Sequence, residues 1–186
     1  MEIKEPTLRV KADTSGNFMT TISGKRIVYD DLQPHMIDIT DIAHALSNIC
    51  RFGGHINRFY SVAQHSVHVS ENVPKEMALA ALLHDASEAY LSDIVRPAKR
   101  MLPQYKELEL KLQRVIEGRF GCEFDHEEIH VADNKMLYAE AKHFYGDISD
   151  WGLDTFACDA IIVPFSPAES RLMFMHRFNE LTFGGG

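Results

Sequence analysis

Acidic and imidazole side chains interrupt the otherwise apolar segment "ALLHDASEAY". His84, Asp85 and Glu88 stand there among alanines and leucines of the kind that line the inward face of a helix. Because burying an unpaired carboxylate is costly, these side chains need partners from other parts of the chain. His65, in "SVAQHS", and Asp133, in "ADNKMLYAE", are suitable partners at helix-compatible positions.

Imidazole nitrogens and carboxylate oxygens together favour a divalent transition metal, without choosing among Mn, Co, Ni, Fe and Zn. The predicted ligands are His65, His84, Asp85 and Asp133. Four protein ligands leave coordination positions for water and substrate, as in catalytic sites. The alternative is a buried polar network that holds no metal. We favour the metal, because separate segments of the chain supply matching ligands.

The order of these residues resembles the metal-binding pattern of the HD-domain phosphohydrolases. Within that superfamily the chain looks most like the bacterial 5′-deoxynucleotidases and related phage or prophage HD proteins. The matching region covers roughly residues 40 to 142. The motifs that carry the resemblance are Arg51-Phe52, "SVAQHS", "LLHDASEAYLSDI" and "ADNKMLYAE".

The resemblance also implies roles for residues that are not ligands. It implies that Glu88 activates the attacking water or delivers protons around it, and that Asp93 contacts the sugar. Arg51 falls at the position of a phosphate-facing arginine that neutralises charge as the ester breaks. Phe52 stands where the relatives have a tryptophan that packs on the deoxyribose. Arg96, with Lys99 and Arg100, adds cations close to the expected pocket.

Each of these residues also has a structural interpretation. Glu88 could be a solvated helix residue or the partner of an arginine. Asp93 could cap the following helix, and Arg51 could satisfy the last carbonyl groups of a helix. Glu140 lies about two turns after Asp133 on the same helix face, where it could support a ligand or form a salt bridge; it is left out of the predicted site.

His68 is a further candidate, because it lies three residues after His65 on the same predicted helix face. It could contact substrate or bind metal in a two-metal variant, but the interpretation as a residue that binds no metal is favoured.

Taken together, the resemblance implies a 5′-nucleotidase that hydrolyses deoxyribonucleoside 5′-monophosphates to deoxynucleoside and phosphate. One alternative is an HD hydrolase of cyclic nucleotides, nucleoside triphosphates or alarmones. Another is a nucleotide-binding regulator without turnover. Relatives of this kind are commonly dimers, so a homodimer is expected.

Composition narrows the class of protein. The chain has 186 residues, 45% of them hydrophobic, which suits one compact domain with a real core. Its net charge of −8 argues against coating a nucleic-acid polymer, which needs a dense basic face. No run approaches the ~20 apolar residues of a membrane span, and the start lacks the apolar core of a secretory signal. We therefore expect a cytoplasmic enzyme, away from membranes, with its three cysteines reduced.

The elements that must position the site are predicted to be mostly helical. We expect an all-α HD-domain bundle with a small N-terminal β-hairpin, forming a single domain over residues 1–183. The hairpin is expected at about residues 17–30, with its turn at Ser23-Gly24-Lys25, and the helical core at about 40–181.

Helix boundaries follow from capping and breaking residues. Thr40 is the predicted cap of the first helix. Pro74 is expected in the first turn of a helix that continues into the His84-Asp85 motif. Further helices are predicted after Pro103 with a stop at Gly121, from Asp125 to Tyr145, and from the capping box Ser166-Pro167-Ala168-Glu169, while Pro97 and Pro103 bracket a loop or short helix.

Overall fold

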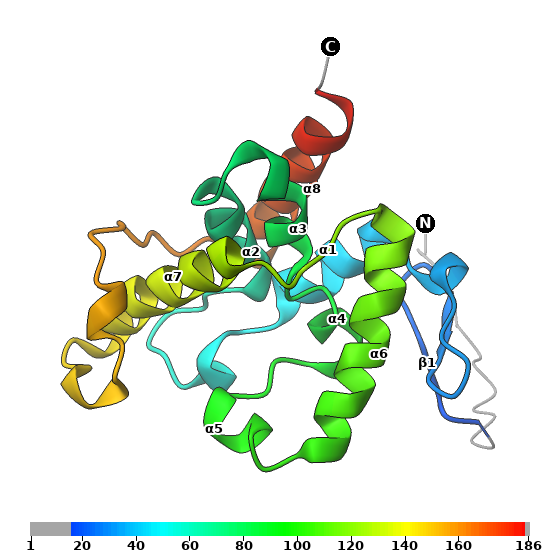
Figure 1. The fold of residues 1–186 in the computed structure, drawn as a ribbon, viewed down its shortest axis with the longest axis horizontal. Helices are drawn as coiled ribbons and strands as arrows, with labels where there is room; N and C mark the ends of the chain where they lie inside the picture. Colours follow the sequence, from blue (N-terminus) through cyan, green and yellow to red (C-terminus); the bar gives the residue numbers. More distant parts are fainter. Residues whose placement is uncertain (1–15, 185–186) are drawn as a thin grey trace, which may run out of the picture.

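A computed structural model describes residues 16–184 (Figure 1). The fold is mostly helical, with a small two-stranded antiparallel sheet close to the start of the described part, as expected. The strands are β1 (Phe18–Thr20) and β2 (Arg26–Val28), and the α-helices are α1 (Ile39–Asn48), α2 (Val62–Glu71), α3 (Ala78–Leu83), α4 (Glu88–Leu91), α5 (Arg96–Lys99), α6 (Pro103–Phe120), α7 (Glu127–Tyr145) and α8 (Pro167–Phe183). Short 3-10 helices are η1 (Pro34–Met36), η2 (Phe52–Gly54), η3 (Lys75–Met77), η4 (Ser149–Trp151) and η5 (Asp154–Phe156).

The hairpin has the predicted position and turn. Its strands pair in the register Phe18 with Val28 and Thr20 with Arg26. Gly24 adopts φ +85° in the turn, a conformation that glycine reaches without steric cost. The Ser23 hydroxyl donates to Asp41 Oδ2 at 2.7 Å, which ties the turn to α1.

The first helix begins differently from the prediction. Asp38, rather than Thr40, is the N-cap of α1, and its Oδ1 accepts from the backbone N–H of Thr40 at 2.9 Å. Aspartate and threonine are both good N-caps, so the residue type alone could not decide between these two positions. The other predicted cap is confirmed, because Ser166 and Glu169 form a capping box at the start of α8.

The prediction of a helix with Pro74 in its first turn that continues into the His84-Asp85 motif is wrong in two respects. Pro74 precedes η3 as its N-cap residue, and α3 ends at Leu83. The residues that follow form a turn with tight backbone bonds, in which the Glu88 N–H donates to the Asp85 carbonyl at 2.9 Å. The motif therefore lies on a turn between α3 and α4.

The later helices follow the predicted breakers. Gly121 caps α6 in the left-handed conformation at φ +68°, and Gly146 follows the last residue of α7. Helix α7 begins two residues later than predicted, at Glu127, and Pro97 lies in the short helix α5.

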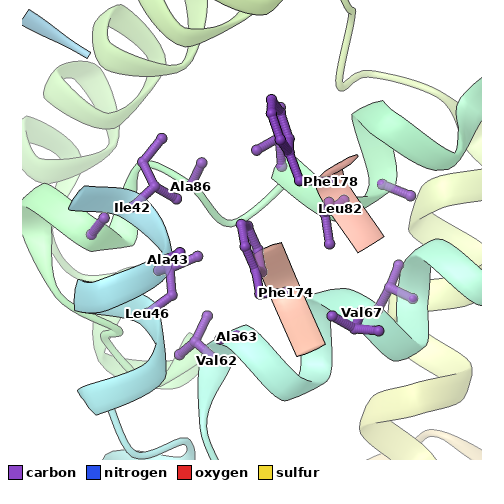
Figure 2. Close-up of a cluster of buried hydrophobic side chains, with 14 of the residues drawn as sticks. Ile42, Ala43, Leu46, Val62, Ala63, Val67, Leu82, Ala86, Phe174 and Phe178 are labelled. Carbon is purple, nitrogen blue, oxygen red and sulfur yellow. The ribbon is translucent and has the colours of Figure 1, made fainter. Parts of the chain in front are cut away.

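The core lies where α1, α2, α3 and α8 pack on one another (Figure 2). Figure 2 shows Phe174 and Phe178 of α8 projecting among apolar side chains of α1 and α2 and of the α3–α4 region. Helix α7 packs against α2, and α4 against α1. These contacts bring the segments that carry the predicted ligands together.

Within residues 16–184, no helix has an apolar stretch long enough to cross a lipid bilayer.

Candidate functional site

The structure brings three of the four predicted ligands together. His65 comes from α2, His84 from the turn after α3, and Asp133 from α7. One ligating atom from each lies within 4.8 Å of the other two, and His65 Nε2 is 3.2 Å from Asp133 Oδ1. His65 is fully buried, whereas the side chains of His84 and Asp133 are 11% and 17% exposed. This group could hold a metal ion.

The two imidazoles are oriented as metal ligands are. His84 Nδ1 lies 2.7 Å from the Ala81 carbonyl oxygen, which can only accept a hydrogen bond, so Nδ1 carries the hydrogen. His65 Nδ1 lies 2.7 Å from Glu140 Oε1. With both Nδ1 atoms donating, each Nε2 faces a neighbouring carboxylate and can hold either a proton or a metal ion there. Both Nε2 atoms are buried and have no hydrogen-bond partner in the described part of the chain, a costly arrangement that a cation would relieve.

Asp85 lies beside this group. Its Oδ2 is 3.3 Å from His84 Nε2 and 3.7 Å from His65 Nε2. It also lies 3.8 Å from Nη1 of Arg51. The structure therefore places the fourth predicted ligand next to the other three, although outside the set whose atoms are mutually close.

The surrounding charges favour a cation. Burial and the nearby Arg51 charge would lower the pKa of His65, but Glu140 and Asp133 raise it to about 9. Burial would raise the pKa of Asp133, but the close contact with His65 and the charges of His65 and His84 lower it. The carboxylates thus stay ionised and stabilise positive charge at this point.

Glu140 is the important residue that sequence reasoning left out. It is fully buried and accepts three hydrogen bonds, from His65, from Tyr60 at 3.0 Å and from Nε of Arg51 at 2.9 Å. Burial would raise its pKa, but Arg51 and His65 lower it. Its spacing from Asp133, seven residues on one helix face, was the available signal. Glu140 positions both a ligand and the predicted phosphate-facing arginine.

Glu88 lies at the buried edge of the site. Its side chain has no partner for Oε2 among the described residues, and Lys99 Nζ lies 3.8 Å from Oε1. Burial, and then the Asp85 and Asp93 charges, raise the pKa of Glu88 well above its usual value. Lys99 in turn lies 2.6 Å from Glu109. The interpretation of Glu88 as a solvated helix residue is therefore wrong.

Asp93 and Arg96 follow Ser92, a residue with φ +71° and ψ 157°. Such a backbone conformation is costly for any residue except glycine, and it re-aims the chain after α4. Burial raises the pKa of Asp93, and no side chain caps α5. Arg96 donates to Asn134 at 2.7 Å and pairs with Asp133.

A pocket of about 690 Å³ opens beside the three predicted metal ligands, and Asp133 forms part of its lining. Its lining includes all the predicted catalytic and substrate residues, and Phe52 faces it from a backbone at φ +57°. The lining residues are Arg51, Phe52, Asp85, Glu88, Asp93, Ile94, Val95, Arg96, Pro97, Lys99, Arg100, Asp133, Leu137, Tyr145, Asp150, Trp151 and Leu153.

His68 stays outside the site, as favoured from the sequence. Its ring nitrogens lie 3.4 Å from Glu71 and 3.4 Å from Gln64.

One relative matches nearly all of the chain, and another matches about half of it. No sequence-family profile matches the chain. It is 38% identical over 110 residues to the uncharacterized protein RCAP_rcc00048 of Rhodobacter capsulatus, covering 54% of this chain and 56% of that protein. It is 41% identical over 177 residues to the uncharacterized protein YfdR of Escherichia coli, covering 89% of this chain and 96% of that protein. With this identity over almost the whole length of both proteins, the chain belongs to the YfdR family.

Proposed function

We propose that this protein is a metal-dependent phosphohydrolase of the HD type, and that it hydrolyses deoxyribonucleoside 5′-monophosphates to deoxynucleoside and phosphate. One observation carries the proposal. Two buried imidazole Nε2 atoms without hydrogen-bond partners among the described residues meet Asp133, and Asp133 lines a pocket that also contains Arg51 and Glu88.

The metal would be held by His65, His84 and Asp133, with Asp85 beside them. The donor set of imidazole and carboxylate suits Mn, Co, Ni, Fe or Zn. A bound divalent ion supplies charge neutralisation for the phosphoryl group and lowers the pKa of water.

Glu88 is suited to orient the attacking water and take its proton. It reaches the pocket from the first residue of α4, three residues after Asp85. A carboxyl group whose pKa is raised by burial works closer to neutral pH, where proton transfer to and from water is most useful. Lys99 at 3.8 Å would stabilise the ionised form.

Arg51 is suited to bind the phosphate. Glu140 engages its Nε and fixes the plane of the guanidinium, while Nη1 lies near Asp85 at the pocket wall. A guanidinium held in this way can donate to two phosphate oxygens. Arg96, Lys99 and Arg100 add positive charge around the same pocket, which attracts an anionic substrate.

The rest of the pocket suits a nucleotide. A volume of about 690 Å³ is typical of sites for small molecules and cofactors. Phe52 and Asp93 line it and offer an apolar ring and a hydrogen-bond acceptor to the sugar. This mixture of cations, carboxylates and aromatic rings matches the three parts of a nucleoside monophosphate.

The test is phosphate release from a panel of deoxy- and ribonucleoside monophosphates. The protein is stripped of metal and resupplied with Mn, Co, Ni, Fe, Zn or Mg in turn. We expect metal-dependent release of phosphate from deoxynucleotides, lost in Asp85→Ala and retained in the matched control Asp159→Ala, which changes an exposed aspartate. Release of pyrophosphate or triphosphate from other nucleotides, or no release with any metal bound, would contradict the proposal.

A further inference from the structure

Three aromatic rings form one wall of the pocket. Phe52 comes from η2, Tyr145 from the end of α7, and Trp151 from η4, and all three line the pocket. Their ring centroids are 5.6 Å apart for Phe52 and Tyr145, 6.3 Å for Phe52 and Trp151, and 5.4 Å for Tyr145 and Trp151. We refer to these three rings as the aromatic wall.

The aromatic wall exposes apolar surface that a core would bury. Tyr145 and Trp151 are each 41% exposed, although both are large aromatic side chains. Both rings contribute to the lining of the pocket, beside polar and charged side chains. Exposed aromatic surface inside a concave site is characteristic of ligand binding.

The wall is held in place before any ligand arrives. The Tyr145 hydroxyl donates to the His55 carbonyl at 2.8 Å, which links α7 to the loop after η2. The backbone N–H of Trp151 donates to the Ile148 carbonyl at 3.0 Å, and the flanking Ile148 and Leu153 are buried. In Figure 1 this segment lies beyond the end of α7, in orange. A preformed surface loses little entropy when a flat group binds it.

The aromatic wall adjoins Arg51, the proposed phosphate-binding residue. The guanidinium carbon of Arg51 lies 5.5 Å from the centre of the Phe52 ring, and that ring in turn lies 6.3 Å from the ring of Trp151 between centroids; all three residues line the pocket. A ligand that binds Arg51 through its phosphate and extends past Phe52 would therefore bring the group farthest from the phosphate to Tyr145 and Trp151.

We propose that Tyr145 and Trp151 form a stacking subsite for the nucleobase of the substrate, with Phe52 as its support on the sugar side. The subsite rests on the proposed nucleotide substrate and adds the group that recognises its base. Stacking on aromatic rings tolerates every base, because each base has a π-face. The enzyme is thus expected to accept purine and pyrimidine nucleotides alike and to discriminate against sugar phosphates without a base.

Trp151 is itself the reporter for the first test, because it is the single tryptophan of the chain. The experiment uses Glu88→Gln, which keeps every predicted metal ligand and slows turnover, in the presence of Mn. We expect dAMP and deoxyadenosine to quench or shift the tryptophan fluorescence, and deoxyribose 5-phosphate to leave it unchanged. Equal responses to dAMP and deoxyribose 5-phosphate, or no response to dAMP at saturating concentration, would overturn the subsite.

The second test separates binding of the base from general damage. Base stacking is worth about 1–3 kcal/mol, so Trp151→Ala should weaken dAMP binding by roughly 5- to 150-fold. Trp151→Phe should retain most of the affinity. Binding of deoxyribose 5-phosphate should be unchanged in both, and Phe183→Ala, which removes an exposed ring from α8, should change neither. An equal loss for both ligands in Trp151→Ala would assign the ring a purely structural role and overturn the proposal.

The two proposals fail in different ways. A change in tryptophan fluorescence with dAMP but not with deoxyribose 5-phosphate, without phosphate release from any nucleotide, would support the stacking subsite and contradict the proposed nucleotidase activity. Phosphate release with identical affinity for dAMP in the original protein and in Trp151→Ala would support the nucleotidase and sink the subsite.

Discussion

Among single residues, Glu140 joins the proposed metal site to the proposed phosphate site. One carboxylate fixes the ring of His65 through Nδ1 and the guanidinium of Arg51 through Nε. Because Glu140 is fully buried, its charge depends on these partners, and their orientation depends on its charge.

Glu140→Gln should lower the metal affinity, because an amide is a weaker acceptor for the His65 Nδ1–H and reduces the basicity of Nε2. Removing such a partner of a metal-binding histidine typically costs about 10- to 100-fold in affinity. The measurement is competition with a metal-binding dye. Glu128→Gln, on an exposed position of the same helix, is the control, and equal affinities in the two variants would contradict the role of Glu140.

Arg51→Lys should lower kcat/KM for phosphate release without preventing metal binding. A lysine at this position keeps a positive charge but cannot hold Glu140 and two phosphate oxygens with one planar group. We expect a loss of about 10²-fold or more, in line with the removal of one preorganised donor from a transition state. Arg58→Lys, at an exposed position, should show no loss; a similar rate in both variants would remove Arg51 from the reaction.

The sequence could predict the residue types of the site but not all of its partners. His65, His84 and Asp133 were predictable because imidazole and carboxylate groups in apolar helices need a reason to be buried. The spacing of Glu140 indicated a possible supporting role, but its contacts with His65 and Arg51 could not be predicted, because both partners are far from it in the sequence. The contact with His65 is made by the packing of α7 on α2.

Among the helices, some ends can be predicted from neighbouring residues and others cannot. Gly121 and the Ser166 capping box were predictable, because their effects involve only neighbouring backbone groups. The end of α3 at Leu83 was not, because the apolar pattern continues through the turn and Ala86 is as buried as the helix. There the tertiary contacts of the site decide the local structure.

The Asp38 cap makes the stability of α1 dependent on pH. A hydrogen bond from Lys25, and then those from Thr40, lower the pKa of Asp38 to about 2. Since the pKa is depressed on folding, the stabilisation is present above the unfolded value near 3.9 and is lost as pH falls toward 2. Asp38→Ala should cost about 1 kcal/mol at neutral pH.

Asp38→Asn is the matched variant, because it keeps the capping oxygen and removes the charge. Its free energy of unfolding, measured with urea, should lie below that of the original protein at pH 6, and the difference should shrink by pH 3. A difference that is constant over this range would contradict the charged cap.

At the scale of the whole molecule, the C-terminal helix is part of the core although it lies outside the predicted motifs. Helix α8 packs against α1, α2 and α3, and Phe174 is fully buried among them (Figure 2). The same helices carry or adjoin the ligands, so the rigidity of the site depends on this packing.

Phe174→Ala should destabilise the protein by about 3–5 kcal/mol, because it leaves a cavity in the centre of the core. Phe183→Ala, at a position 79% exposed on the same helix, should stay within about 0.5 kcal/mol of the original protein. Urea unfolding of both variants checks this. Similar losses in the two would show that α8 does not pack as described.

We propose that His65, His84 and Asp133 hold a metal ion. Isothermal titration of the metal-stripped protein with Mn or Co tests it most directly. We expect one ion bound per chain, with binding abolished in His84→Ala and unchanged in His176→Ala, which removes an exposed imidazole from α8. No binding by the original protein, or binding that survives in His84→Ala, would contradict it.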